Sequence, residues 1–177
     1  MSTYNMVFAG FGGKGVLFSG KVIAYAGLID GKEVSWLPSY GPEMRGGTAN
    51  CSVCISDQPI GSPLVTSPEV LVAMNAPSFD KFIDTVAPGG KVIIDSSLID
   101  RKNPREDVSL YAVPATALSN EKGLSGIANI ILLGKVLAET DFTSLESIEQ
   151  ALQKCVPAKK SHLLEFNMQA IKLGMGM

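Results

Sequence analysis

A short apolar run that enters a glycine-rich loop constrains this chain more than any other feature. The run spans residues 4–9, and the loop reads Gly10-Phe-Gly-Gly-Lys-Gly15. The next stretch, 16–29, is apolar on nearly every side, which is typical of a helix buried on more than one face. A strand that passes through a glycine loop into a helix is the expected start of an α/β unit.

Further apolar segments alternate with helical patterns along the rest of the chain. Strands are predicted at 33–37, 48–56, 69–74, 91–94 and 108–113, and helical patterns follow Pro77 and fill most of the chain beyond residue 125. This alternation predicts a Rossmann-like, three-layer α/β fold, with a mostly parallel sheet and helices on both faces. Since no repeat or linker interrupts the pattern, we expect residues 1–177 to form a single domain.

Three polar residues match the helix-start pattern in the last third of the chain. Ser125 is predicted to cap a helix that reaches about Ala138, and Ser161 to cap the final helix. Between them, Thr143-Ser-Leu-Glu146 has the form of a capping box, in which Thr143 would cap the helix.

The composition limits the function classes that this chain can serve. It is 46% hydrophobic and 18% charged, so it must bury apolar surface in a large core or against partner subunits. The net charge is −2, and no Lys/Arg run suggests a groove for nucleic acid. The longest apolar stretch, 127–138, is interrupted by Asn129 and Lys135, so it cannot span a membrane.

Two features of the sequence bear on the cellular location. No basic segment followed by an apolar one opens the chain, so no secretory signal is visible. The three cysteines, an odd number, fit a reducing compartment better than a disulfide scaffold. We therefore expect a cytoplasmic protein.

Four polar or glycine-rich segments follow predicted strands. They are 10–15, 40–47, 75–77 and 95–97. Ligands of open α/β sheets bind at the carboxyl ends of the strands. We expect a ligand or an interface at this edge, although capping or turn duty is favoured for Asn75 and Asp95.

The glycine loop satisfies the G-x-G-x-x-G pattern through Gly10, Gly12 and Gly15. Glycines allow an anion to approach the backbone amides at a helix start; Lys14 adds a positive charge and Gly13 adds freedom at the turn. A dinucleotide site also needs an acidic residue at the end of the second strand, which here reads Trp36-Leu37-Pro38. The phosphate or pyrophosphate of another cofactor is therefore favoured, with a structural tight turn as the alternative.

The cysteines and the histidine favour structural roles. Cys51 and Cys54 lie three apart on a predicted strand, so their thiols should face opposite sides and bind no common ion. Cys155 is predicted on an apolar helix face. Iron–sulfur clusters need about four thiolates, so this chain is not expected to hold one alone. His162 is expected at the start of a helix.

Arg45 stands out within the second glycine-rich loop. Ordering a lone arginine there is unfavourable unless it meets an anion or a carboxylate. Contact with a cofactor or a neighbouring subunit and an internal ion pair with Glu43 both remain open. No Ser/His/Asp set, histidine pair or paired-carboxylate motif is present, so no catalytic residue and no metal ligand is assigned. A binding domain without catalytic groups suggests part of a larger assembly.

Two segments together carry a family resemblance. They are Gly10-Phe-Gly-Gly-Lys-Gly-Val16 and Ser39-Tyr-Gly-Pro-Glu-Met-Arg-Gly-Gly-Thr-Ala-Asn-Cys51. With Val53-Cys-Ile-Ser-Asp-Gln-Pro-Ile-Gly-Ser-Pro63, they resemble the gamma subunit of 2-oxoacid:ferredoxin oxidoreductases. The resemblance covers essentially the whole chain, and the second segment is far more specific than the glycine loop.

The resemblance implies a place in a decarboxylating enzyme. In this family the assembly cleaves a 2-oxoacid, releases CO2, forms an acyl-coenzyme A and passes two electrons to ferredoxin. Thiamine pyrophosphate, Mg²⁺ and [4Fe–4S] clusters belong to partner subunits: thiamine-binding alpha and beta chains and a ferredoxin-like delta subunit or ferredoxin. The gamma part is associated with coenzyme A. A homodimer is an alternative state for the isolated chain.

The substrate and two other classes of function stay open at this stage. The short, separate chain favours 2-oxoglutarate and succinyl-coenzyme A, with pyruvate or a branched-chain 2-oxoacid as alternatives. An autonomous nucleotide- or coenzyme-A-binding regulatory protein is a second class. A small oxidoreductase that uses Cys51 and Cys54 is a third, disfavoured by their placement on a strand.

The resemblance also implies a set of cofactor-binding residues in two loops. The glycine loop would contribute Gly10, Gly12, Gly13, Lys14 and Gly15, and the second loop would contribute Tyr40, Glu43, Arg45, Gly46 and Gly47.

We predict that Arg45→Ala in the assembled enzyme changes the Michaelis constant for coenzyme A or the turnover. Coenzyme A carries a diphosphate and a 3′-phosphate, either of which would pair with a guanidinium. Steady-state kinetics with varied coenzyme A tests this role. Unchanged values for both constants would show that Arg45 does not have it.

Overall fold

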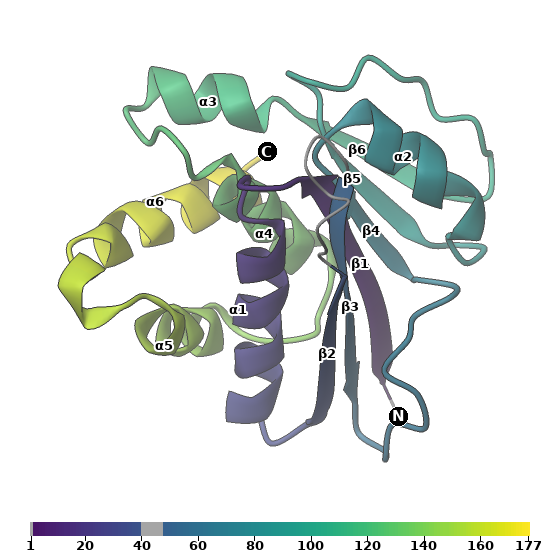
Figure 1. The fold of residues 1–177 in the computed structure, drawn as a ribbon, viewed down its shortest axis with the longest axis horizontal. Helices are drawn as coiled ribbons and strands as arrows, with labels where there is room; N and C mark the ends of the chain where they lie inside the picture. Colours follow the sequence, from purple (N-terminus) through teal and green to yellow (C-terminus); the bar gives the residue numbers. More distant parts are fainter. Residues whose placement is uncertain (1, 40–47) are drawn as a thin grey trace.

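Six strands form one sheet in the order β2-β3-β1-β4-β5-β6 (Figure 1). The computed structural model describes residues 2–39 and 48–177. The strands are β1 (Thr3–Phe11), β2 (Glu33–Ser39), β3 (Thr48–Ser56), β4 (Val70–Ala73), β5 (Lys91–Asp95) and β6 (Ser109–Val113). Strand β3 runs in the opposite direction to the other five strands, and the pairs β1–β4, β4–β5 and β5–β6 are parallel. The predicted mostly parallel sheet is thus confirmed.

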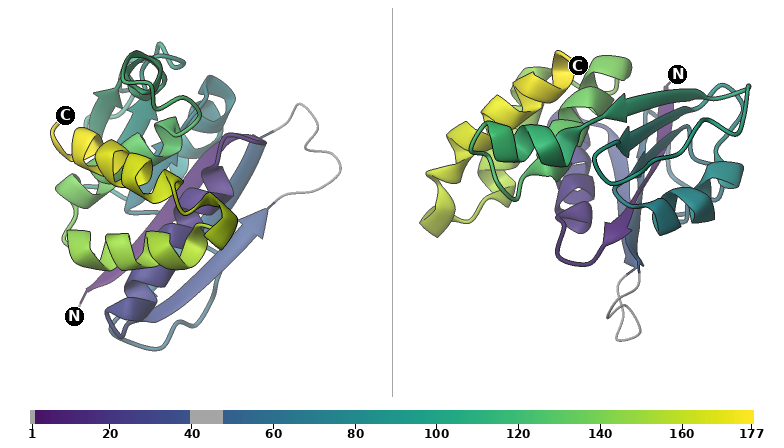
Figure 2. Two further views of the ribbon diagram at one scale, coloured as in Figure 1. Left: turned by 90° about the vertical axis from the view of Figure 1, so that its left-hand side faces the viewer. Right: turned by 90° about the horizontal axis from the view of Figure 1, so that it is seen from above.

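Helices cover both faces of the sheet, as predicted (Figures 1 and 2). One face carries α1 (Val16–Ile29) and α4 (Ala128–Glu139); the other carries α2 (Ala76–Phe82) and the single turn η2 (Ile83–Thr85). The remaining helical segments are α3 (Ala115–Glu121), α5 (Leu145–Cys155), η3 (Ala158–Lys160) and α6 (Leu163–Met175). Within the described ranges, none of these helices has both the length and the apolar character to cross a membrane.

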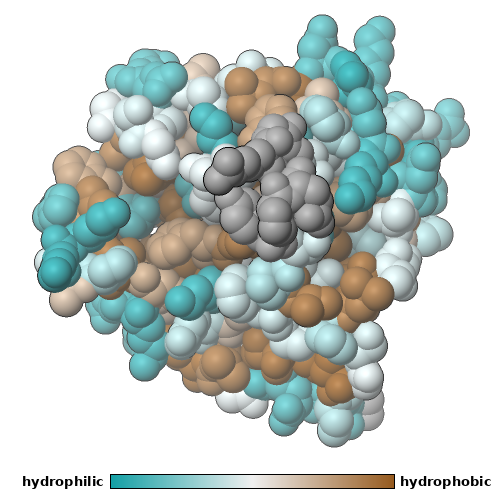
Figure 3. Space-filling view, viewed as in Figure 1, coloured by the Kyte–Doolittle hydropathy of each residue, from teal (hydrophilic) through white to brown (hydrophobic). Residues whose placement is uncertain are grey.

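Helices α5 and α6 lie outside α1 and α4 and form a further layer on that face (Figure 2). Helix α5 packs on α1, and α6 packs on α4. The space-filling view shows apolar surface between α1 and these outer helices (Figure 3). Because α1 and α4 are covered from two sides, the prediction that 16–29 is buried on more than one face is confirmed.

The parallel strands are buried on both sides. On β1, Met6 and Phe8 belong to the core beneath α1 and α4, while Val7 and Ala9 belong to a second core beneath α2. The same alternation on β4 and β5 explains why these segments are almost continuously apolar in the sequence.

Two glycines bring α1 unusually close to the sheet. A Cβ atom on Gly20 would overlap the Cys51 sulfur, and one on Gly27 would lie 2.9 Å from Val34. Since both glycines face β2 and β3, side chains of these two strands lie directly against the backbone of the helix.

A second pair of glycines joins α4 to α6. A Cβ atom on Gly134 would overlap the carbonyl oxygen of Ile171, and one on Gly174 would overlap that of Ile131. The two backbones therefore touch directly. This contact fixes the position of α6, whose first residue, Leu163, lines a cavity.

All three predicted helix-start residues are wrong. Helix α4 begins after Ile127 rather than at Ser125, and α6 begins after His162 rather than Ser161; neither start has a side-chain cap. At α5 the cap is Ser144, which accepts a hydrogen bond from the Ser147 amide at 3.1 Å. The neighbouring Thr143 hydroxyl instead donates to Asp30, at the far end of α1, at 2.5 Å.

We predict that Gly174→Ala lowers the free energy of unfolding by about 2 kcal/mol or more, because the added methyl group must push two backbones apart. Gly61→Ala is the matched control, since nothing lies within 4 Å of a Cβ at Gly61. The control should be neutral or stabilising by up to about 1 kcal/mol. Urea unfolding followed by circular dichroism measures both, and equal midpoints would contradict the proposed packing.

Candidate functional site at the carboxyl edge of the sheet

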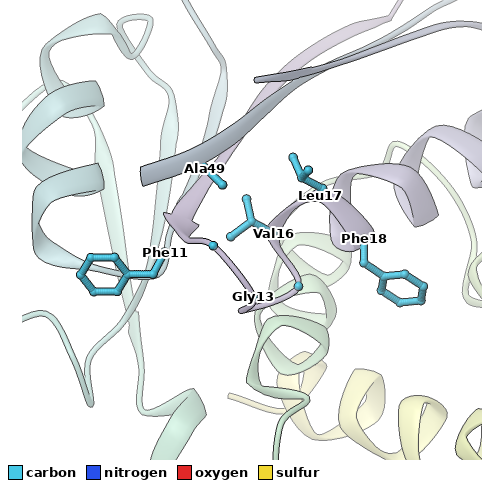
Figure 4. Close-up of a pocket in the computed structure, with 8 residues that line it drawn as sticks. Phe11, Gly13, Val16, Leu17, Phe18 and Ala49 are labelled. Carbon is cyan, nitrogen blue, oxygen red and sulfur yellow. The ribbon is translucent and has the colours of Figure 1, made fainter. Parts of the chain in front are cut away.

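The glycine loop forms a tight turn from β1 into α1 (Figure 4). Gly13 and Gly15 have φ angles of 81° and 76°, a region that other residues rarely adopt. In Figure 4, Phe11 and Phe18 point away from the loop on opposite sides. The loop backbone is thus left open toward the edge of the sheet.

Gly10 and Gly15 are required by close packing. A Cβ atom on Gly10 would lie 2.8 Å from Val16 and 2.9 Å from Met74. At Gly15, which precedes the first residue of α1, a Cβ would overlap the side-chain amide of Asn129. A larger residue at Gly10 would push β1 away from Met74, and one at Gly15 would push the start of α1 away from α4.

Asn129 of α4 forms hydrogen bonds to the start of α1. Its side-chain nitrogen donates to the Gly15 carbonyl and to the Ser19 hydroxyl, both at 3.1 Å. The amide is buried, with 5% of its surface exposed. These bonds hold the N-terminal ends of the two helices side by side.

The start of α1 is suited to an anion. No side chain caps this helix and its first turn contains no acidic residue, so its first amide groups remain available. The exposed Lys14 adds a positive charge. Among the described residues, no carboxylate forms an ion pair with Lys14.

A polar cavity of about 300 Å³ lies beside the loop, and we call it the switch-point cavity. It is lined by Gly13, Lys14, Met74, Leu98, Thr116, Ser119, Asn120, Ser125, Gly126 and Ala128. Helix α1 leads from β1 toward β2, whereas α2 leads from β4 toward β5 on the opposite face. The cavity therefore lies where the winding of the sheet reverses, the usual binding crevice of open α/β folds.

The chemistry of the switch-point cavity fits a phosphate. Among the residues that the structure describes, its lining includes one lysine, three hydroxyl groups and one side-chain amide, and no acidic side chain. The start of α4 at Ala128 adds the positive end of a second helix dipole. A smaller apolar recess of about 150 Å³ lies on the other side of the loop, between Phe11, Phe18 and Ala49.

Asp95 and Asn75 perform the capping and turn duties predicted for them. Asp95 is fully buried and accepts hydrogen bonds from the Ser97 amide at 3.1 Å and the Thr116 hydroxyl at 2.5 Å. Asn75 accepts from the Ser78 amide at 2.9 Å. Both residues shape the edge of the sheet beside the cavity.

The structure brings together five predicted site residues, all in the glycine loop: Gly10, Gly12, Gly13, Lys14 and Gly15. The other five, Tyr40, Glu43, Arg45, Gly46 and Gly47, lie outside the described residues. Their flanks are placed: Ser39 pairs with Asn50, and Thr48 pairs with Phe11, where the glycine loop begins.

Sequence reasoning missed the α3–α4 side of the site. Thr116, Ser119 and Ser125 carry no local signal of binding. Asn129 did leave a signal, because it interrupts an otherwise apolar helix, but the sequence could not show what it would meet.

The cysteines and the histidine lie where the sequence predicts. Cys51 faces α1, where its sulfur lies near the Val16 carbonyl at 3.8 Å, and Cys54 faces the opposite side. Burial raises the pKa of both thiols, that of Cys51 to about 12. His162 is exposed immediately before α6. Within the described ranges, no group of three or more His, Cys, Asp or Glu residues could hold a metal ion.

A solved structure defines the class of this fold. The chain superimposes on the gamma subunit of a keto/oxoacid ferredoxin oxidoreductase from Geobacter sulfurreducens with a TM-score of 0.83 and 31% identity. The match covers 98% of this chain and 96% of that subunit. The fold is thus that of a gamma-type subunit of an oxidoreductase.

The chain belongs to the pyruvate ferredoxin/flavodoxin oxidoreductase family, whose model matches residues 5–177. It is 40% identical over 168 residues to the ketoisovalerate oxidoreductase subunit VorA of Methanothermobacter thermautotrophicus, covering 94% of this chain and 34% of that relative. It is also 38% identical over 164 residues to the 2-oxoglutarate synthase subunit KorC of Methanocaldococcus jannaschii, covering 90% of this chain and 88% of KorC. The chain thus spans about a third of VorA but most of KorC.

We predict that Cys51 resists alkylation in the folded protein at pH 8. With a pKa of about 12, its thiolate fraction is about a thousandfold smaller than that of a free cysteine. Iodoacetamide labelling mapped by mass spectrometry should modify the half-buried Cys155 first and Cys51 only near pH 12 or after unfolding. Equal labelling of the two in the native state would contradict the burial of Cys51.

Proposed function

We propose that this chain is the gamma subunit of a 2-oxoacid:ferredoxin oxidoreductase that converts 2-oxoglutarate to succinyl-coenzyme A. In this reaction the 2-oxoacid loses CO2, coenzyme A takes up the acyl group as a thioester, and two electrons pass to ferredoxin. The observation that carries the proposal is the nearly end-to-end similarity to KorC, at 38% identity. We further propose that residues 1–177 act as one domain and that the assembly is cytoplasmic.

Two relatives of similar identity point to different substrates. VorA is named a ketoisovalerate oxidoreductase subunit and KorC a 2-oxoglutarate synthase subunit. We favour 2-oxoglutarate because KorC subunits of four archaea are similar to this chain, at 32–38% identity. Ketoisovalerate and pyruvate are the alternatives that the test below separates.

The role proposed for the switch-point cavity is to hold a phosphate group of coenzyme A. Lys14 would neutralise its charge, and the backbone amides of Gly13 and Ala128, which line the cavity, would donate hydrogen bonds to its oxygens. The Ser125 hydroxyl lines the same cavity and can also donate, whereas the hydroxyls of Thr116 and Ser119 already donate within the protein. The free groups are thus donors or positive, which favours a phosphate that arrives without its own metal ion.

The same lining does not fit thiamine pyrophosphate with Mg²⁺. Magnesium prefers carboxylate and other oxygen ligands, and none of the described residues that line the cavity is acidic. We therefore assign thiamine pyrophosphate, Mg²⁺ and the [4Fe–4S] clusters to partner subunits: the thiamine-binding alpha and beta chains and a ferredoxin-like delta subunit or ferredoxin.

The second loop completes the proposed site. Tyr40, Glu43, Arg45, Gly46 and Gly47 are proposed from the sequence as residues that face the cofactor or a neighbouring subunit. The flanking pair Thr48 and Phe11 supports this, since it places one end of the loop beside the glycine loop.

Affinity purification of the tagged chain from its native cytoplasm, under anaerobic conditions, tests the proposed assembly. Coenzyme-A-dependent reduction of a viologen dye is assayed with 2-oxoglutarate, pyruvate and ketoisovalerate. The expected result is co-purification of larger iron–sulfur and thiamine-binding chains, with 2-oxoglutarate preferred. A colourless single chain without activity would refute the subunit role, and preference for another oxoacid would refute the substrate.

We predict that Lys14→Gln raises the Michaelis constant for coenzyme A about tenfold, because a charge-assisted hydrogen bond to phosphate is lost. Turnover at saturating coenzyme A should change little. Lys154→Gln on α5 is the matched control, since it removes an exposed lysine that does not line the cavity. Equal constants for the two variants would show that Lys14 does not bind coenzyme A.

A further inference from the structure

A further cavity, more apolar than the switch-point cavity, shares the backbones of Gly13 and Gly126 with it. Its volume is about 360 Å³, within the range of small-molecule sites. We call it the helix-corner cavity, and it is lined by Gly13, Gly15, Phe18, Gly126, Ile127, Asn129, Ile130, Cys155, Val156, Pro157, Lys160, Leu163 and Asn167. In Figure 3 it corresponds to the apolar hollow between α1 and the outer helices.

Three long helices direct their N-terminal ends at this cavity. The starts of α1, α4 and α6 contribute Gly15, Ile127 and Leu163, and each carries the positive end of a helix dipole. The end of α5 at Cys155 contributes one dipole of opposite sign. With Lys160 at the rim and no acidic side chain among the described residues that line it, the cavity favours a negative charge.

Asn167 supplies the independent sign of a ligand. It lies on α6 with 5% of its surface exposed, lines the cavity, and its amide makes no hydrogen bond to another described residue. Its oxygen and nitrogen are not among the fully enclosed side-chain atoms without a partner, so the amide opens into the cavity, where a ligand can reach it. A hydrogen-bond acceptor on a ligand inside the cavity would pair with the side-chain nitrogen of Asn167.

The remaining walls fit an aliphatic body. Phe18, Ile127, Ile130, Val156 and Leu163 present apolar side chains, so a fully polar ligand would leave them without partners. The single lysine matches one negative charge, whereas a phosphate dianion would favour more donors.

We propose that the helix-corner cavity binds a small amphipathic monoanion: a carboxylate whose oxygens meet Asn167 and Lys160, with an aliphatic chain against Phe18 and Ile130. This site goes beyond the proposed function. Lys14 lines the switch-point cavity and not this one, so the ligand is separate from the phosphate of coenzyme A. The two cavities share the backbones of Gly13 and Gly126. A ligand in one cavity therefore contacts the same backbone that a ligand in the other cavity contacts.

Protection of Cys155 from alkylation tests the proposal on the full chain, with hexanoate as the probe. Cys155 lines the cavity and is half-buried, so a bound ligand shields its thiol. Hexanoate at ten times its dissociation constant should slow iodoacetamide labelling of Cys155 about tenfold. Hexan-1-ol, which has the same chain without the charge, should protect far less.

Two variants identify the residues that bind the carboxylate. Asn167→Leu keeps the size of the side chain and should weaken hexanoate protection about tenfold. Lys160→Gln should weaken it as well, whereas Lys159→Gln, one residue away and outside the lining, should not. Absence of protection, equal protection by hexan-1-ol, or full protection in both Asn167→Leu and Lys160→Gln would overturn the proposal.

A crossed comparison separates this site from that of coenzyme A. Lys14→Gln should retain hexanoate protection, and Asn167→Leu should retain the Michaelis constant for coenzyme A in the assembled enzyme. If coenzyme A displaced hexanoate in strict competition, the helix-corner cavity would belong to the coenzyme A site and the inference would be wrong.

Discussion

The hydrogen bonds from Asn129 to Gly15 and Ser19 are the contact on which the edge of this protein depends. A glycine loop is flexible by itself, and two positive φ angles are maintained only where neighbouring structure determines them. Asn129 provides that neighbour from a helix more than a hundred residues away in the chain. By fixing the start of α1 against α4, it aligns two helix N-terminal ends on one crevice and separates the two cavities beside it.

The electrostatic character of the site follows from this alignment. Helix dipoles and one lysine give the crevice its positive potential, because no acidic residue within 2–39 and 48–177 lines either cavity. Such a field holds an anion without needing catalytic side chains. This suits a subunit whose proposed task is to position coenzyme A while thiamine pyrophosphate and iron–sulfur clusters are held by other chains.

The layers of helices on one face of the sheet explain the apolar composition. Helices α1 and α4 are covered by the sheet on one side and by α5 and α6 on the other, so they need apolar residues all round. Gly134 and Gly174 bring the backbones of α4 and α6 into contact, and Gly20 and Gly27 allow side chains of the sheet to reach the backbone of α1. Some apolar surface remains at the edge of the sheet, where Phe11 and Leu98 are 41% and 48% exposed, and it borders the cavities that partner subunits would be expected to face.

The sequence by itself determined the local elements and the glycine loop. The predicted bounds 16–29 and 48–56 are those of α1 and β3, because burial periodicity is encoded residue by residue. The cavities and the helix caps were decided only by tertiary structure. Both Thr143 and Ser144 are residues that can cap a helix, and Ser144 is the cap because α5 begins at Leu145, while the Thr143 hydroxyl donates to Asp30. Likewise, the polar break at Asn129 was visible in the sequence, but its partner Gly15 was not, since contacts between distant segments depend on how the layers pack.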